Sequence, residues 1–162
     1  MAHNVGVLAK DFLIQLTREQ IDALFRNARA LPPERLEWRP MDQGRSALDQ
    51  VRECAAIPRL LSRILRERAF NVEREEMDAL RAEWATWSLD EAEKIGRKET
   101  EEFLQLLASL DEETLETSIP VPIFGGRERT LLEIAATHAW NLIYHNGQIA
   151  YIQTLLGDRE MH

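Results

Sequence analysis

Four long segments with apolar residues at helical spacing place the strongest limits on how this chain can fold. Each segment also carries start or stop signals for a helix. Pro32 and Pro33 interrupt the chain after the first segment, and Gly157 closes the last one. The predicted helices cover residues 6–30, 46–70, 88–110 and 130–157. Four helices of this length in 162 residues predict one all-α domain over residues 1–162, built as a four-helix bundle.

The segment before the last helix does not follow the helical pattern. TSIPVPIFGGRERT, residues 117–130, contains β-branched residues, two prolines and a Gly-Gly pair. These residues predict a short extended hairpin or an irregular crossover. Ser88 and Thr130 each have a glutamate three positions later, which predicts capping boxes at two helix starts, and Ser46 with Asp49 approximates one.

Charge and cysteine content exclude several classes of protein. The chain has 28 acidic and 20 basic residues and a net charge of −8, without the basic stripe that nucleic acids or anionic membranes require. We therefore expect no nucleic-acid partner and no membrane partner. The single cysteine, Cys54, cannot form an intrachain disulfide, and no secretory signal or membrane-spanning stretch is visible. A cytoplasmic location is the expectation.

The last predicted helix places polar residues among its apolar ones. At 100° per residue, His145 shares the inward face with leucines and isoleucines, and Asn141 and Gln148 lie along its margin. Asn141 and His145 are four residues apart, a spacing that lets two helical side chains hold one ion. His138 shares the face but lies two turns from His145, roughly 10 Å away along the axis, too far for easy sharing.

Glu53 on the second predicted helix is a possible partner for the polar residues of the last helix. It lies on a stripe with Gln50 and Ile57, and a buried carboxylate there requires a proton, a cation or a metal. His145 on the last helix is a candidate partner. Two readings stay open, a satisfied structural pair and a catalytic centre. Cys54 lies on a second, apolar stripe, as expected of a small core residue.

A second face of the last helix is aromatic. Trp140, Tyr144 and Tyr151 fall within one arc, with Gly147 between them. Such a stripe must be covered, either by the crossover at residues 118–127 or by a second subunit. The second alternative makes these residues a homodimer interface.

Three segments resemble the DinB-like (damage-inducible) family of four-helix bundles, which includes thiol-dependent transferases. They are LEWRP after the first helix, RSALDQVRECA at the start of the second, and NLIYHNGQIAYIQTLLGD in the last. The resemblance spans residues 6–158. It implies a divalent metal held by three histidines, at the positions of Glu53, Asn141 and His145. Only His145 keeps the family residue.

Two hypotheses from different classes follow. In the first, Glu53, Asn141 and His145 hold one divalent transition metal, Zn, Ni or Mn, which activates a small thiol or water for thiol-transferase or hydrolase chemistry. Gln148 and His138 would then lie beside the ligands and orient them. In the second, the site is degenerate and the protein is a non-enzymatic, dimeric binding or stress-related module.

Overall fold

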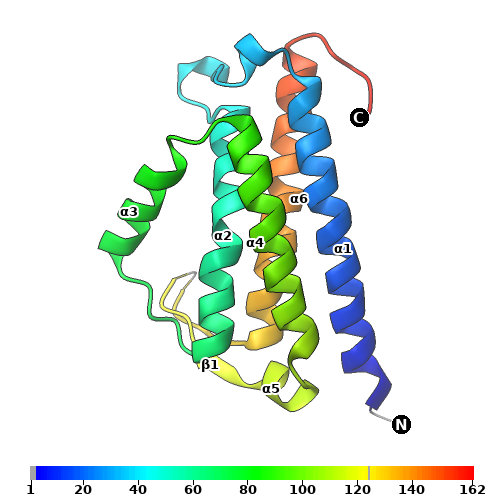
Figure 1. The fold of residues 1–162 in the computed structure, drawn as a ribbon, viewed down its shortest axis with the longest axis vertical. Coiled ribbons are helices and arrows are strands. Elements are labelled where there is room, and N and C mark those ends of the chain that lie inside the picture. Colours follow the sequence, from blue (N-terminus) through cyan, green and yellow to red (C-terminus); the bar gives the residue numbers. More distant parts are fainter. Residues whose placement is uncertain (1–2, 124) are drawn as a thin grey trace.

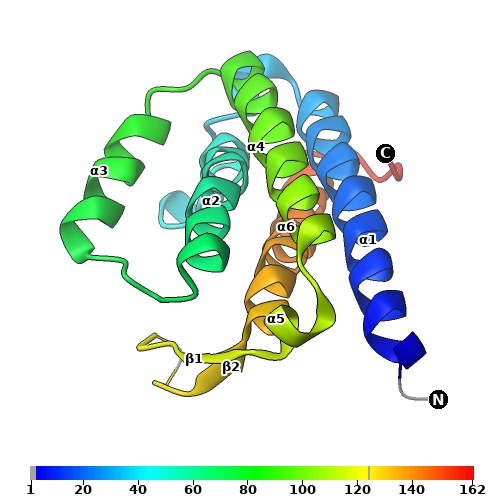
Figure 2. The same cartoon turned by 60° about the horizontal axis from the view of Figure 1, so that its bottom comes forward.

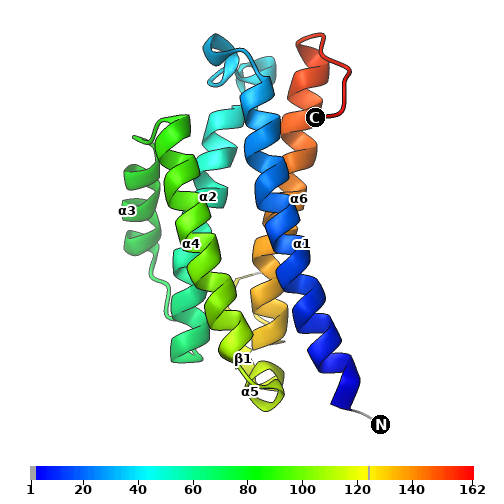
Figure 3. The same ribbon diagram turned by 45° about the vertical axis from the view of Figure 1, so that its right-hand side comes forward.

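Four long helices form the bundle in the computed structural model, which describes residues 3–123 and 125–162 (Figures 1 and 3). They are α1 (His3–Ala30), α2 (Ala47–Glu67), α4 (Leu89–Ser109) and α6 (Leu131–Leu155). Helices α1 and α6 run in one direction, and α2 and α4 run in the other. Helix α6 packs against both α1 and α2, and α4 closes the ring by contacting the same two helices. The predicted four-helix bundle is confirmed.

The connections explain why α2 and α4 are parallel. After α2, helix α3 (Arg74–Trp84) carries the chain back along the outside of the bundle, so α4 starts at the same end as α2 (Figure 1). Helix α5 (Glu112–Glu116) and the strands β1 (Ser118–Pro120) and β2 (Glu128–Thr130) lie at the opposite end (Figure 2). The strands pair antiparallel with Ile119 opposite Arg129. The extended segment predicted before the last helix is thus a hairpin.

Helix boundaries follow the capping residues. The capping boxes of Ser88 with Glu91 and Thr130 with Glu133 are both formed. Ser46 accepts a hydrogen bond from the backbone of Asp49. Helix α2 ends at Glu67, three residues before the predicted end at residue 70, because Arg68 adopts a left-handed conformation with φ 51°.

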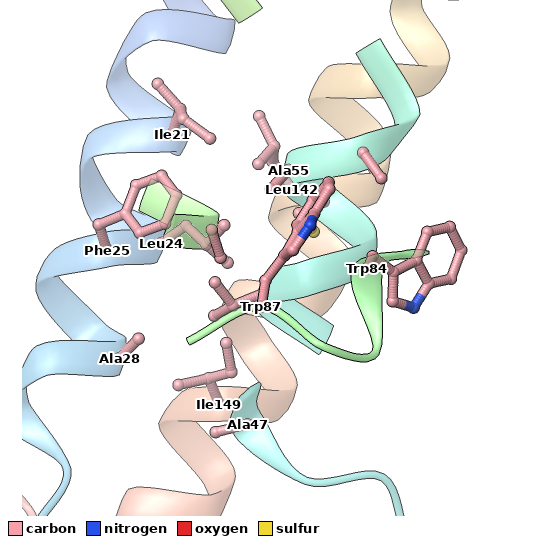
Figure 4. Close-up of a cluster of buried hydrophobic side chains, with 14 of the residues drawn as sticks. Ile21, Leu24, Phe25, Ala28, Ala47, Ala55, Trp84, Trp87, Leu142 and Ile149 are labelled. Carbon is pink, nitrogen blue, oxygen red and sulfur yellow. The ribbon is translucent and has the colours of Figure 1, made fainter. Parts of the chain in front are cut away.

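The segment between α1 and α2 covers one end of the bundle with two short 3-10 turns, η1 (Pro33–Arg35) and η2 (Pro40–Asp42). Below it lies a core cluster to which α1, α2, α4 and α6 contribute; Figure 4 shows part of it, including Phe25, Ala55 and Leu142. Gly96 of α4 lies so close to Ala55 that a Cβ there would be 2.9 Å from the alanine methyl. This close approach fixes α4 against α2.

Helices α1 and α6 are joined by buried amides that the sequence did not predict. Asn146 accepts a hydrogen bond from Asn27 at 3.2 Å and donates to the Gln20 carbonyl at 3.1 Å. Two turns further on, Gln153 donates to the Asn27 carbonyl at 2.8 Å. These bonds fix the rotation of α6, and so they fix which residues it presents to α2.

Candidate functional site

Helices α2 and α6 bring His145 and Glu53 together near the end of the bundle that the 31–46 segment covers. His145 Nε2 lies 3.2 Å from Glu53 Oε1. The histidine is only 2% exposed, whereas Glu53 is half-buried. The pairing expected from the two helical stripes is therefore present in the structure.

Gln50, one turn before Glu53 on α2, binds the other ring nitrogen. Its Oε1 lies 2.8 Å from His145 Nδ1, and its Nε2 donates to the Arg45 carbonyl at 3.5 Å. With the amide in this orientation, His145 Nδ1 carries a proton and donates it to Gln50. The Nε2 atom then faces a carboxylate oxygen, and a proton or a metal cation must lie between these two atoms.

Arg45 completes the network from the segment before α2. It donates to Glu53 Oε2 at 2.7 Å and to Asp49 Oδ2 at 2.6 Å. Burial alone would raise the pKa of the Glu53 carboxyl, but the hydrogen bond from His145 and the charge of Arg45 outweigh burial and lower that pKa to about 2. Glu53 is ionised at neutral pH. With a proton between His145 Nε2 and Glu53 Oε1, the network of Arg45, Asp49, Glu53 and His145 carries no net charge.

Asn141 does not join Glu53 and His145. Its Nδ2 donates instead to Cys54 Sγ at 3.6 Å. Cys54 is fully buried, and this burial, with the neighbouring Glu53 charge, raises the pKa of its thiol well above the usual value. The expected core role of Cys54 fits this environment, and Asn141 is the polar group that lies against it.

His138 lies in a different part of the core. Its Nε2 is 3.0 Å from Thr100 Oγ1 of α4, and its ring meets Phe103 edge-on at 5.6 Å. Burial lowers the His138 pKa to about 3, so the ring is neutral. The structure therefore places His138 against α4 and not beside the Glu53–His145 pair.

An open cavity of about 580 Å³ adjoins the network. Arg45 and Gln50 line it on one side, and Tyr144, Gln148 and Tyr151 of α6 line it on the other. The Tyr144 ring also meets the His145 ring edge-on at 5.1 Å, which links the cavity wall to the network. Gln148, expected beside the site, is thus a cavity residue.

The aromatic face of α6 is exposed. Trp140, Tyr144 and Tyr151 are 56%, 50% and 64% exposed, and the Trp140 and Tyr144 rings stack at 5.3 Å. The hairpin leaves these side chains open, so the expectation that the crossover covers them does not hold in this chain. Coverage by a second subunit remains a prediction.

The residues at this site fit a proton better than a metal. Within residues 9–123 and 125–162, no three His, Cys, Asp or Glu side chains are grouped to hold an ion. Asn141, the third family position, points to Cys54. A dication between His145 and Glu53 would also add a positive charge beside Arg45 that no further carboxylate of the network balances.

Comparison with known proteins assigns the family. The family model described as the DinB superfamily matches residues 14–149, most of the chain, and the protein belongs to this superfamily. No curated protein sequence matches the chain. None of the helices in the described part of the chain is long and apolar enough to cross a membrane.

Several solved structures share the fold at low sequence identity. YfiT from Bacillus subtilis, described as a probable metal-dependent hydrolase with an unusual four-helix bundle topology, superposes with a TM-score of 0.79 at 15% identity, covering 92% of this chain and 88% of YfiT. The DinB-like protein YjoA from Bacillus subtilis gives 0.66 at 15% identity over 93% and 95% of the two chains. A mycothiol-dependent maleylpyruvate isomerase gives 0.69 at 12% identity over 86% of this chain and only 60% of the isomerase.

Proposed function

We propose that this protein is a metal-free, non-enzymatic member of the DinB superfamily that binds a small molecule in the cavity beside His145. The observation that supports the proposal is the closed network around the family's metal position. Both ring nitrogens of His145 have partners within the protein, and both Glu53 oxygens do too. A site whose donor atoms are already engaged by Gln50 and Arg45 has no free base or ligand for catalysis.

The test is elemental analysis of untagged protein purified without chelator, together with Glu53→Ala and His145→Ala. The proposal predicts far less than one equivalent of transition metal in all three proteins, and no rise in wild-type melting temperature on adding Zn, Ni or Mn. His162→Ala is the matched control, because His162 lies 2.6 Å from Asp158 at the surface and could collect ions by itself. A stoichiometric metal that both site variants lose would overturn the proposal.

A second candidate is the metal-dependent enzyme, with thiol-transferase or hydrolase activity. One observation favours it: His145 Nδ1 donates to Gln50, as the non-ligating nitrogen of a metal-binding histidine does, and this leaves Nε2 and Glu53 to share an ion. The mycothiol-dependent isomerase and the description of YfiT supply the reaction classes to screen, with a small thiol as one reactant. The metal analysis separates the two candidates.

The proposal includes a homodimer, supported by the exposed aromatic face of α6. Trp140 stacks on Tyr144 and more than half of its surface is open. Aromatic residues are enriched in interface cores, and a charge at such a position prevents association. Light scattering should therefore give a dimer mass for the wild type and a monomer mass for Trp140→Glu. A wild-type monomer at micromolar concentration would remove the dimer from the proposal.

A further inference from the structure

The cavity beside the network carries no unpaired charge. Arg45 is the one charged residue among those described that line it, and its guanidinium is held by Asp49 and Glu53. A ligand carboxylate would have to compete with both of these for Arg45. A ligand cation would find the two carboxylates already neutralised. The electrostatics of the cavity therefore match an uncharged ligand.

The uncharged lining residues include two aromatic rings and three amides. Tyr144 and Tyr151 present half-exposed rings two turns apart on α6, and Ile152 also lines the cavity. The Gln50 amide is engaged by His145 and Arg45, which leaves the amides of Gln43 and Gln148 to bind a ligand. A flat apolar ring fits the tyrosines, and a hydrogen-bonding edge fits the amides.

Gly147 provides the space. It lies within the body of α6, where glycine destabilises a helix by roughly 0.5–1 kcal/mol relative to alanine. Apart from its chain neighbours and the backbone of its own helix, no atom of the described residues lies within 4 Å of where its Cβ would be, so packing against other parts of this chain does not require the glycine. Gly147 does line the cavity between Tyr144 and Tyr151. The missing side chain leaves the wall open where a ring could lie on the helix.

From these three features we infer that the cavity binds an uncharged small molecule with a flat ring and an amide-like edge, the ring lying over Gly147 and the edge on Gln43 and Gln148. This inference rests on the proposed function, because it takes the Arg45–Glu53–His145 network as closed. It adds the chemical class of the ligand, which the network alone does not specify.

Three ring probes of similar size and different charge test the inference. Benzamide, benzoate and benzylammonium are titrated into ¹⁵N-labelled wild-type protein at neutral pH, and amide shifts are followed by NMR. Benzamide should move the signals of Gly147 and Gln148 with millimolar affinity, as suits so small a ligand. The two charged probes should bind at least tenfold more weakly. Tighter binding of either charged probe, or no binding of benzamide, overturns the inference.

Two substitutions locate the binding. Gly147→Leu fills the cavity, whereas Ala150→Leu adds the same bulk to an exposed position of α6 outside it. Gln148→Leu removes an amide, and Gln105→Leu is the matched change on the exposed side of α4. Benzamide binding should be lost in Gly147→Leu, fall at least threefold in Gln148→Leu, and persist in both controls. Unchanged binding in both cavity variants would place the ligand elsewhere and overturn the inference.

Light scattering on Gly147→Leu separates a small molecule from a second copy of the chain. A molar mass equal to that of the wild type supports the small-molecule site, and a fall in mass shows that another subunit fills the space, which overturns the inference. The metal analysis is independent of these results. If the wild-type protein is metal-free and does not bind benzamide, only the inferred ligand class is wrong. If it carries stoichiometric metal, the proposed function is wrong.

Discussion

His145 Nε2 and Glu53 Oε1 face each other across 3.2 Å between helices α6 and α2. Gln50 holds the far nitrogen of the ring, and Arg45 holds the far oxygen of the carboxylate. Because each end of the pair is fixed, the two groups cannot turn apart without breaking a further hydrogen bond. The pair therefore joins the two helices at the position where the family resemblance implies a metal.

Lowering the pH should remove the contribution of Glu53 to the stability of the folded protein. Its pKa is lowered to about 2 in the folded protein, so its stabilisation is complete above the ordinary carboxyl pKa of 4.5 and is lost as the pH falls toward 2. The shift corresponds to at most about 3 kcal/mol. Glu53→Gln should be less stable than wild type at pH 7, and the difference should shrink between pH 4.5 and 2. Urea unfolding across this range measures it.

Glu128→Gln is the control for that experiment, because Glu128 is an exposed residue of β2. It should track the wild type at every pH. A Glu53→Gln protein as stable as wild type at pH 7 would show that the network contributes no stability.

His138 should affect the stability of the folded protein over a different pH range. Burial lowers its pKa to about 3, so the unfolded chain takes up a proton near pH 6.5 that the folded chain does not. Wild-type stability should fall as pH drops below 6.5, with a contribution of up to about 1.4 kcal/mol per pH unit. The double variant His138→Leu, Thr100→Val removes the group and its partner and should flatten this slope between pH 6.5 and 4.5. An unchanged slope would contradict a neutral buried His138.

The sequence predicted the parts of this structure that depend on local patterns. Four apolar stripes gave the helices, and Ser88 and Thr130 marked two of their starts correctly. The pairing of Glu53 with His145 also followed, because two inward polar residues on neighbouring helices must satisfy one another. Helix α3 is not among the four predicted helices, because its 11 residues are mostly polar and it packs on the outside of the bundle.

What the sequence could not give depends on rotation and side-chain direction. Asn141 shares a helix face with His145, yet its amide turns to Cys54, a choice that spacing alone does not decide. Arg45 precedes α2 and binds Glu53, which is eight residues later in the chain. Helical spacing predicts contacts only between residues three or four apart. Asn146 and Gln153 donate hydrogen bonds from their side-chain amides to α1. The one sequence signal for these contacts is that the two residues are seven apart and so lie on one face of the helix.

Cys54 should be unreactive in the native protein. Full burial raises the pKa of its thiol well above the usual value, so almost no thiolate exists at neutral pH. Ellman's reagent should label less than a tenth of the thiol in native protein within an hour, and all of it in urea. Rapid labelling without denaturant would show that the α2–α6 contact opens and that Asn141 does not seal the thiol.

Gly147→Ala should stabilise the protein. A Cβ there meets nothing, and alanine is favoured over glycine in a helix by about 0.5–1 kcal/mol. The melting temperature should rise by a few degrees. Gly96→Ala is the contrasting variant, because a Cβ at Gly96 lies 2.9 Å from Ala55 and should destabilise the α2–α4 contact. A destabilised Gly147→Ala protein would mean that another molecule packs against this position.

The measurement that bears most directly on the metal-free network is the protonation of the His145 ring, read from ¹H–¹⁵N correlations of ¹⁵N-histidine-labelled protein at neutral pH, with assignment by His145→Gln. The hydrogen-bond geometry predicts one proton between Nδ1 and Gln50 and one between Nε2 and Glu53, and no change on adding Zn. A ring with an unprotonated Nε2 whose signal shifts stoichiometrically with Zn would contradict it and make the metal-dependent candidate the better description.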